Sequence, residues 1–376
     1  MNDESLRAAL ALWRVPGIGP ERWRRLIEQC GDPQTALRAC DAELQRCQLT
    51  SPRIKALRIP DWRGADSDLD WSRGAGCAII DNAHPAYPDT LRTLPGAPPL
   101  LFVRGDLDLL RFPALAVVGS RNPTDGGLRN AKAFAATLAA RGLAVISGLA
   151  LGIDAAAHHG ALHARGATIA VMATGPDRIY PQANRPLAKQ IAQSGLLVTE
   201  FPTGVMPHRA FFPRRNRLIC GLALGTLVVE AALRSGSLIT ARQARDQGRE
   251  VFAIPGSIHN PLSRGCHQLI RQGAKLVESA DDIYEEIGPQ LDTCQPHPAP
   301  PPDAPAEAGR PAAAPTAEHR QLLSAMGYDP IGIDTLVERL ELTPEAISSM
   351  LLILELEGHV VISPGGTYTR VSGETT

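Results

Sequence analysis

Residues 209–241 read RAFFPRRNRLICGLALGTLVVEAALRSGSLITA, and this stretch decides the fold. It opens with aromatic and basic side chains, passes through a small-residue helix into an apolar run at 226–229, and ends at Ser235-Gly-Ser237, where another helix begins. A helix, a buried strand and a second helix in this order are typical of an α/β sheet. The cations and rings suit a phosphate chain that carries stackable bases. Core phenylalanines with arginines on the surface give the same pattern, so this stretch alone leaves both interpretations open.

The alternation of strands and helices extends on both sides of this stretch, over residues 77–288. Apolar runs predict strands at 115–119, 144–147, 168–172, 196–199, 227–229, 251–254 and 275–277. Helical patterns follow these runs, near 127–141, 152–165, 184–194, 214–223, 238–247, 266–272 and 281–287. Strands that are apolar on both faces and joined by helices predict a doubly wound parallel sheet, the Rossmann-like α/β fold.

Small residues follow nearly every predicted strand. The turns read Gly119-Ser-Arg121, Ser147-Gly148-Leu149, Thr174-Gly-Pro176, Ser235-Gly236-Ser237 and Pro255-Gly-Ser257. Ligands of such sheets bind beyond the carboxyl ends of the strands, where glycine admits a ligand to the backbone and helix N-termini present unpaired N–H groups. Together with the arginines at 121 and 214–217, this edge is expected to attract phosphates. Neither GxGxxG nor GxxxxGKS/T occurs, so the sequence predicts no dinucleotide fingerprint and no P-loop.

Acidic side chains near the strand ends raise the question of catalysis. Asp154, Glu200 and Glu230 lie where paired carboxylates would perform acid–base chemistry. Such acids more often pair with nearby arginines or cap helices, and Arg215 and Arg217 are plausible partners. We therefore predict no catalytic residue and no enzymatic activity.

Three histidines and one serine have alternative interpretations of the same kind. His158, His159 and His163 share a helical segment, but neither an HExxH pattern nor a clear third ligand accompanies them. Core or hydrogen-bonded histidines are expected instead of a metal site. Ser237 is expected to cap a helix or donate to an anion, because no histidine has a defined role as its base. The sequence thus predicts neither a metal nor a cofactor.

The N-terminal residues 1–70 predict a compact helical module. Val15-Pro-Gly-Ile-Gly-Pro20 lies between helical patterns at 6–14 and 21–30 and resembles a helix-hairpin-helix turn. Backbone N–H groups of such a turn can meet a DNA phosphate, but Gly-x-Gly turns between helices are common, so structural packing is slightly favoured. Residues 62–76 are interpreted as a connector to the sheet domain.

The C-terminal part begins with a proline-rich linker at 289–316, which contains nine prolines. Three helical patterns and a hairpin pattern follow, at 317–326, 333–340, 344–357 and 358–370, with the hairpin turn at Pro364-Gly-Gly366. This order predicts a winged helix over 317–372. Its third helix contains no lysine or arginine, so phosphates would repel it, and we expect it to contact protein instead of duplex DNA.

Charge and composition narrow the class of protein. The net charge of −1 combines about +7 in residues 1–288, −2 in residues 289–316 and −6 in residues 317–376, so a basic body precedes an acidic domain. No run of about 20 apolar residues is present, and the N-terminus does not resemble a signal peptide. The seven cysteines form no CxxC pair. We expect no membrane span, no zinc module, and a reducing cytoplasmic location.

The central domain closely resembles the DprA/Smf family of bacterial DNA-processing proteins. The matching motifs, in family order, are VGSR (118–121), SGLALGID (147–154), TGPDRIYP (174–181), TEFP (199–202), FPRRNRLI (212–219), VVEA (228–231), SGSLITA (235–241), IPG (254–256) and LIRQGA (269–274). The resemblance also implies a helical module before the sheet and a winged helix after it.

The resemblance implies a homodimer that binds and protects single-stranded DNA and helps load RecA recombinase onto it during natural transformation and recombination. Carried over by motif, the DNA pocket would include Arg121 together with Phe212, Arg215 and Arg217. With the neighbouring cations and the helix N-terminus added, the predicted DNA site comprises Arg121, Gly148, Arg209, Phe212, Arg214, Arg215, Asn216, Arg217, Ser235, Gly236 and Ser237.

The sequence is also compatible with two other functions. The LOG-type phosphoribohydrolases have a related sheet, and their PGGxGT…E signature would fall near Leu224-Gly-Thr226 and Glu230, but Leu222-Ala-Leu224 replaces the paired glycines. An architectural duplex-DNA binder that acts through the N-terminal hairpin is the third possibility.

Overall fold

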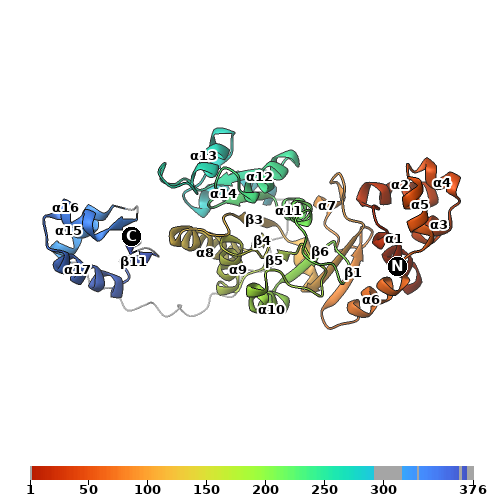
Figure 1. Ribbon diagram of the computed structural model, residues 1–376, viewed down its shortest axis with the longest axis horizontal. Helices are drawn as coiled ribbons and strands as arrows, with labels where there is room; N and C mark the ends of the chain where they lie inside the picture. The colour runs from red at the N-terminus through yellow and green to blue at the C-terminus, as the bar shows by residue number, and fades with distance from the viewer. Residues whose placement is uncertain (1, 292–315, 328–329, 364–365, 371–376) are drawn as a thin grey trace. The chain divides into compact units, whose positions relative to one another are not determined.

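The computed structural model describes residues 2–291, 316–327, 330–363 and 366–370. The chain divides into two compact units, residues 1–300 and 301–376, and the colours of Figure 1 follow the chain through both. The first unit contains a helical module and a large sheet. The second is a small α/β domain.

The central sheet has nine strands in the order β1-β2-β6-β5-β4-β3-β7-β8-β9. Seven of them are parallel: β3 (Ala114–Val118), β4 (Ala144–Ser147), β5 (Thr168–Val171), β6 (Leu196–Thr199), β7 (Gly225–Val228), β8 (Glu250–Ala253) and β9 (Lys275–Leu276). The chain winds outward from β3 to β6 and then returns to place β7 on the other side of β3. The predicted doubly wound fold is therefore confirmed, and its strand order reverses between β3 and β7.

Two antiparallel strands extend this sheet beyond the predicted strands, the first of which begins at residue 115. β1 (Cys77–Asp81) pairs with β2 (Leu100–Gly105), and β2 pairs antiparallel with β6. The connection between them contains the short helix α7 (Asp89–Arg92) and several prolines. Such a hairpin lies outside the strand–helix–strand repeat, so the periodicity that reveals the parallel strands does not reveal it.

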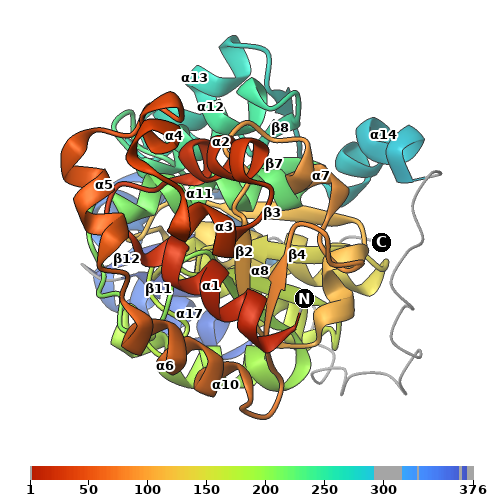
Figure 2. The ribbon, with the colours of Figure 1, turned by 90° about the vertical axis from the view of Figure 1, so that its right-hand side faces the viewer.

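Helices cover both faces of the sheet because alternate strand residues point to opposite sides. Leu115 and Val117 of β3 pack with one helix layer, while Ala116 and Val118 pack with the other. The first layer contains α8 (Asp125–Ala140), α9 (Ile153–His163), α10 (Arg185–Ser194) and α14 (Ala280–Leu291). The second contains α11 (Phe211–Leu222), α12 (Gly236–Asp246) and α13 (Arg264–Arg271), and Figure 2 shows these elements from the side.

The N-terminal module consists of α1 (Asp3–Arg14), α2 (Pro20–Cys30), α3 (Pro33–Arg38), α4 (Asp41–Arg46), α5 (Ser51–Arg58) and α6 (Trp62–Ser72). The prediction of a connector at 62–76 was wrong, because most of it is the helix α6. Asp61 caps this helix by accepting the Gly64 N–H at 2.9 Å. Ala65 and Leu69 are then buried against α1 and β2, so packing stabilises a segment whose own apolar pattern is short.

The second unit is the predicted winged helix. It contains α15 (Ala317–Met326), β10 (Ile331–Gly332), α16 (Ile333–Leu340), α17 (Pro344–Leu356), β11 (Val360–Ser363) and β12 (Thr367–Arg370). Its three strands form a sheet in the order β10-β12-β11, and a core of its own includes Leu322, Leu336, Ile347 and Leu351. The predicted hairpin turn at Pro364-Gly-Gly366 lies partly outside the described residues.

Within the described ranges of the chain, no helix is both long enough and apolar enough to cross a membrane.

Candidate functional site

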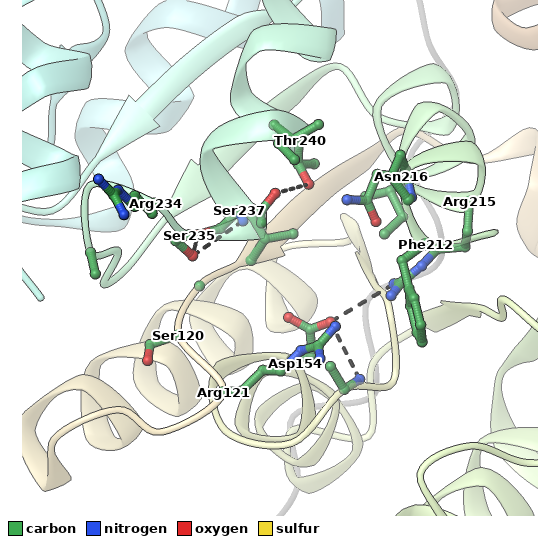
Figure 3. A pocket seen from close by; sticks show the side chains of 18 of the residues that line it. Ser120, Arg121, Asp154, Phe212, Arg215, Asn216, Arg234, Ser235, Ser237 and Thr240 are labelled. Atoms are coloured by element: carbon green, nitrogen blue, oxygen red, sulfur yellow. Dashed lines mark hydrogen bonds and ion pairs between the residues drawn. The ribbon is translucent and has the colours of Figure 1, made fainter. Parts of the chain in front are cut away.

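A cavity of about 550 Å³ opens where the strand order reverses, beyond the carboxyl ends of β3 and β7. We call it the edge pocket. Figure 3 shows that its lining comes from the turn after β3 and from the starts of α9, α11 and α12. Its lining includes Ser120, Arg121, Asn122, Asp154, Arg209, Phe212, Arg215, Asn216, Arg234, Ser235, Gly236, Ser237 and Thr240.

The floor of the edge pocket is a buried cation. Arg215 is 4% exposed and lies 3.9 Å from the Asp154 carboxylate. Asp154 also accepts the backbone N–H groups of Gly148 and Ala150, at 3.1 and 3.4 Å. Glycine at 148 leaves room for the Arg215 side chain, because a Cβ there would come within 1.2 Å of its guanidinium. The Arg215 Nε is itself buried and has no hydrogen-bond partner among the described residues.

Burial shifts the pKa values of both charged groups in this floor. Burial lowers the pKa of Arg215, and the nearby Arg121 lowers it further, while Asp154 opposes the shift. Burial likewise raises the pKa of Asp154, against the opposing effect of Arg215. Both charged forms are thus incompletely compensated in this low-dielectric site. An anion that supplied negative charge near both arginines would stabilise them.

One wall of the pocket presents a ring and a second cation. The Arg121 guanidinium lies 5.2 Å from the centre of the Phe212 ring. The Tyr180 ring packs against the Phe212 ring at a tilt, with a distance of 5.9 Å between the ring centres. Phe212 is only partly buried, and Tyr180 is 46% exposed. An aromatic face beside cations is the arrangement on which bases stack while the backbone meets positive charge.

The opposite wall is the N-terminus of α12. Ser235 is its N-cap and accepts the Ser237 N–H at 3.3 Å, while the two hydroxyls lie 2.6 Å apart. Ser237 is therefore the second helical residue and not the cap itself. With Gly236 between them, these residues present hydroxyls and helix N–H groups to the cavity, and a helix N-terminus favours an anion.

The structure brings most of the predicted site residues to one cavity. Those that line it are Arg121, Arg209, Phe212, Arg215, Asn216, Ser235, Gly236 and Ser237. Gly148 lies beneath it, against Arg215. Arg234, Ser120 and Asn122 also line it, although the sequence prediction did not include them. The sequence could have indicated them, because they lie beside Ser235 and Arg121 in the same two turns.

Besides Gly148, two predicted site residues do not line the cavity, Arg214 and Arg217. Both bind the carboxylate of Glu200, which is completely buried at the end of β6. Arg214 donates to it at 3.2 and 3.1 Å, and Arg217 donates at 2.6 Å. Arg217 also donates to the carbonyl of Gly96.

Glu230 and His158 have structural partners. Glu230 accepts from the Thr124 backbone N–H and hydroxyl, at 2.9 and 2.6 Å, and so holds the residue that caps α8. His158 is buried, its Nδ1 lies 2.7 Å from the Thr168 hydroxyl, and burial lowers its pKa to about 3. The described ranges contain no cluster of His, Cys, Asp or Glu that could hold a metal. Residues 224–226, considered for a phosphoribohydrolase loop, start β7 at the sheet edge opposite the pocket.

Three family models match the chain. The model described as DNA recombination-mediator protein A matches residues 78–288, the DprA winged helix domain matches 296–366, and the DprA-like N-terminal HHH domain matches 3–48. The last match agrees with the helix-hairpin-helix resemblance of the α1–α2 turn. The three matches follow the chain from the N-terminal module to the winged helix.

Relatives and solved structures agree with these models. The Smf protein of Escherichia coli K12 is 42% identical over 334 residues, which cover 87% of this chain and 86% of the relative. The DNA processing protein DprA of Streptococcus pneumoniae R6 is 50% identical over 246 residues, or 65% and 85% of the two chains.

Two solved structures share the fold. The X-ray structure of DprA from Streptococcus pneumoniae aligns with a TM-score of 0.67 at 36% identity and covers 74% of this chain and 97% of its own. A structure of DprA from Helicobacter pylori, which concerns the single-stranded DNA binding mode of that protein, aligns with a TM-score of 0.52 at 30% identity over 58% of this chain and 97% of its own. The matched domains, the sequence identity and the shared fold lead to one conclusion: the chain belongs to the DNA recombination-mediator protein A family.

Proposed function

We propose that this protein binds single-stranded DNA in the edge pocket. The observation that carries the proposal is the composition of that cavity: four arginines (Arg121, Arg209, Arg215 and Arg234), a partly exposed ring and a helix N-terminus converge on it. Cations and N–H groups suit the phosphates, and the ring suits the bases. The Helicobacter pylori relative, whose structure concerns a single-stranded DNA binding mode, lends further support.

We further propose that the bound strand is delivered to RecA, and that the protein works as a homodimer in the cytoplasm without catalysing a reaction itself. Binding through phosphates and stacked bases is independent of sequence, which a mediator of recombination requires. The buried acids Glu200 and Glu230 are engaged by Arg217 and Thr124, which supports a binding role over an acid–base one.

The direct test is a salt series of fluorescence anisotropy titrations with labelled oligothymidine and with a duplex of equal length. We expect a clear single-strand preference and a steep fall of affinity with salt. Arg121→Ala should weaken binding and reduce the salt slope by about 0.7, the value for one phosphate contact on a single strand. Equal or tighter binding of the duplex would contradict the proposal.

A matched control removes a cation elsewhere. Lys189 is exposed on α10 and does not line the edge pocket. Lys189→Ala should leave both affinity and slope close to those of the parent protein. A RecA filament-formation assay on oligothymidine then tests delivery: the parent should accelerate assembly, and Arg121→Ala should not.

A further inference from the structure

The helix α11 presents two different faces. Phe212, Arg215 and Asn216 line the edge pocket, whereas Arg214 and Arg217 lie one turn apart and share another face of the helix. In the sequence all of them belong to one basic cluster. The structure divides them, so the second pair needs an explanation of its own.

Glu200 accounts for that second pair. Its side chain is 0% exposed, and both carboxylate oxygens are engaged by arginines of α11, with the shortest contact of 2.6 Å to Arg217. The Arg217 side chain is 16% exposed and spans from Glu200 to the carbonyl of Gly96. A phosphate that recruited Arg217 would have to leave this buried carboxylate without its partner, which is strongly unfavourable.

The N-terminal module contacts the same group. The Trp13 indole of α1 donates to the backbone carbonyl of Glu200 at 2.8 Å, in a buried hydrogen bond. The Arg214 guanidinium lies between two rings, 5.8 Å from the centre of Trp13 and 4.9 Å from that of Phe201. A continuous set of contacts therefore runs from α1 through Glu200 and Arg214 to the helix that lines the pocket.

We propose that Glu200 is a positioning residue for single-stranded DNA binding. Through Arg214 and Arg217 it fixes α11 so that Phe212 and Arg215 face the edge pocket, and Trp13 fixes Glu200 in turn. Arg214 and Arg217 then serve as internal ligands of Glu200 and not as phosphate contacts. The inference rests on the proposed function, because the pocket that α11 orients is the proposed DNA site.

Neutralising Glu200 separates this role from a simple charge effect. Glu200→Gln removes a negative charge close to the basic pocket and frees two arginines, so electrostatics alone would tighten DNA binding. Positioning requires the opposite: affinity for oligothymidine should fall about threefold or more, the range of coupling between residues that share a network. Unchanged or tighter binding overturns the proposal.

The salt slope identifies what Arg217 does. Arg217→Ala should lower affinity without changing the slope, whereas Arg121→Ala should reduce the slope by about 0.7. Arg217→Lys should not restore affinity, because one ammonium group cannot span Glu200 and Gly96 as the guanidinium does. A reduced slope in Arg217→Ala, or full rescue by lysine, would make Arg217 a phosphate contact and overturn the proposal.

Variants that disturb the fold less than Glu200→Gln control for unfolding. Trp13→Phe removes the indole N–H and part of the ring but keeps an aromatic side chain, and it should weaken DNA binding in the same direction as Glu200→Gln, though less. Trp71→Phe is its matched control, since Trp71 contacts Phe102 and lies outside this set of contacts. Thermal unfolding of each variant verifies that the titrations are made on folded protein. Equal effects of the two tryptophan variants would count against the proposal.

Hydrogen exchange distinguishes a failure of this inference from a failure of the proposed function. Glu200→Gln should accelerate backbone exchange in Phe211–Leu222 of α11 and leave Asp125–Ala140 of α8 unchanged. If the parent protein binds no oligothymidine but α11 still loosens, the DNA function fails while the positioning of α11 by Glu200 stands. If α11 exchanges at the parental rate, the positioning role is wrong whether or not DNA binds.

Discussion

Phe212 is the side chain on which base stacking in the edge pocket most directly depends. Its ring faces the cavity between Arg121 and Tyr180. Phe212→Ala should weaken oligothymidine binding by about 1–3 kcal/mol, the usual contribution of one stacked base. Its neighbour Phe211 packs on Phe201 at 4.6 Å and provides the control. Anisotropy titrations at one salt concentration measure both variants, and an equal loss in Phe211→Ala would assign Phe212 to the core.

Gly148 tests whether the buried cation is part of the site. Its backbone has ordinary φ, so alanine is tolerated there, but the added methyl group would displace the Arg215 guanidinium. Gly148→Ala should therefore weaken DNA binding as strongly as loss of one charged contact, about tenfold. Gly126→Ala in α8 is the matched control, because its new Cβ would meet only Thr124 at 3.6 Å. Unaltered titration curves for Gly148→Ala would remove Arg215 from the site.

His158 makes stability depend on pH. Burial lowers its pKa to about 3 from an ordinary 6.5, so the folded protein keeps it neutral while the unfolded chain takes up a proton. The stability is fully present above pH 6.5 and is lost as the pH falls toward 3, by about 2 kcal/mol at pH 5. His158→Asn should flatten the fall of Tm between pH 7.5 and 5. The exposed His163→Asn should not, and an equal pH dependence in all three proteins would refute this assignment.

At the scale of elements, the parallel strands were predictable because each is a short apolar run that ends in a small-residue turn. The sheet then brings Gly119-Ser-Arg121 and Ser235-Gly-Ser237 to one edge, since carboxyl ends of parallel strands meet there. The convergence of Arg121, Arg215 and the start of α12 could be anticipated for that reason. The antiparallel β1 and β2 could not, because their long connection interrupts the repeat.

The sequence could not predict which way each arginine side chain of α11 points. Arg214, Arg215 and Arg217 lie within four residues and carry the same charge, so composition treats them alike. Their separation depends on the phase of the helix relative to Glu200, and on Trp13, which is nearly 190 residues away along the chain. Similarly, α6 was missed because the packing of Ala65 and Leu69 stabilises it more than its local pattern does.

At the scale of the whole molecule, charge is divided between the two units. Residues 292–376 contain twelve acidic and four basic side chains, and all residues that line the edge pocket lie between Val118 and Thr240. A protein that ends at Leu291 should therefore still bind oligothymidine. At low salt its affinity should equal or exceed that of the full chain, and the difference should vanish as salt screens the charges.

Titrations of the two proteins side by side test this prediction. Loss of single-strand binding on truncation would show that the winged helix supplies essential contacts. A duplex affinity that disappears with residues 292–376 would refute the expectation that α17, which lacks lysine and arginine, does not bind duplex DNA.

The core shared by α1, α6 and β2 has a consequence for how the first unit melts. Leu10, Leu69 and Phe102 belong to one buried cluster, and Arg14 binds the fully buried Asp68 at 2.6 Å and the Thr203 carbonyl at 3.0 Å. Neither the helical module nor the sheet can open alone without exposing the apolar surface of the other. Two family models thus describe one cooperative body. Calorimetry of residues 1–291 should show a single transition whose van't Hoff and calorimetric enthalpies agree. Removal of the first 75 residues should destabilise the sheet that remains.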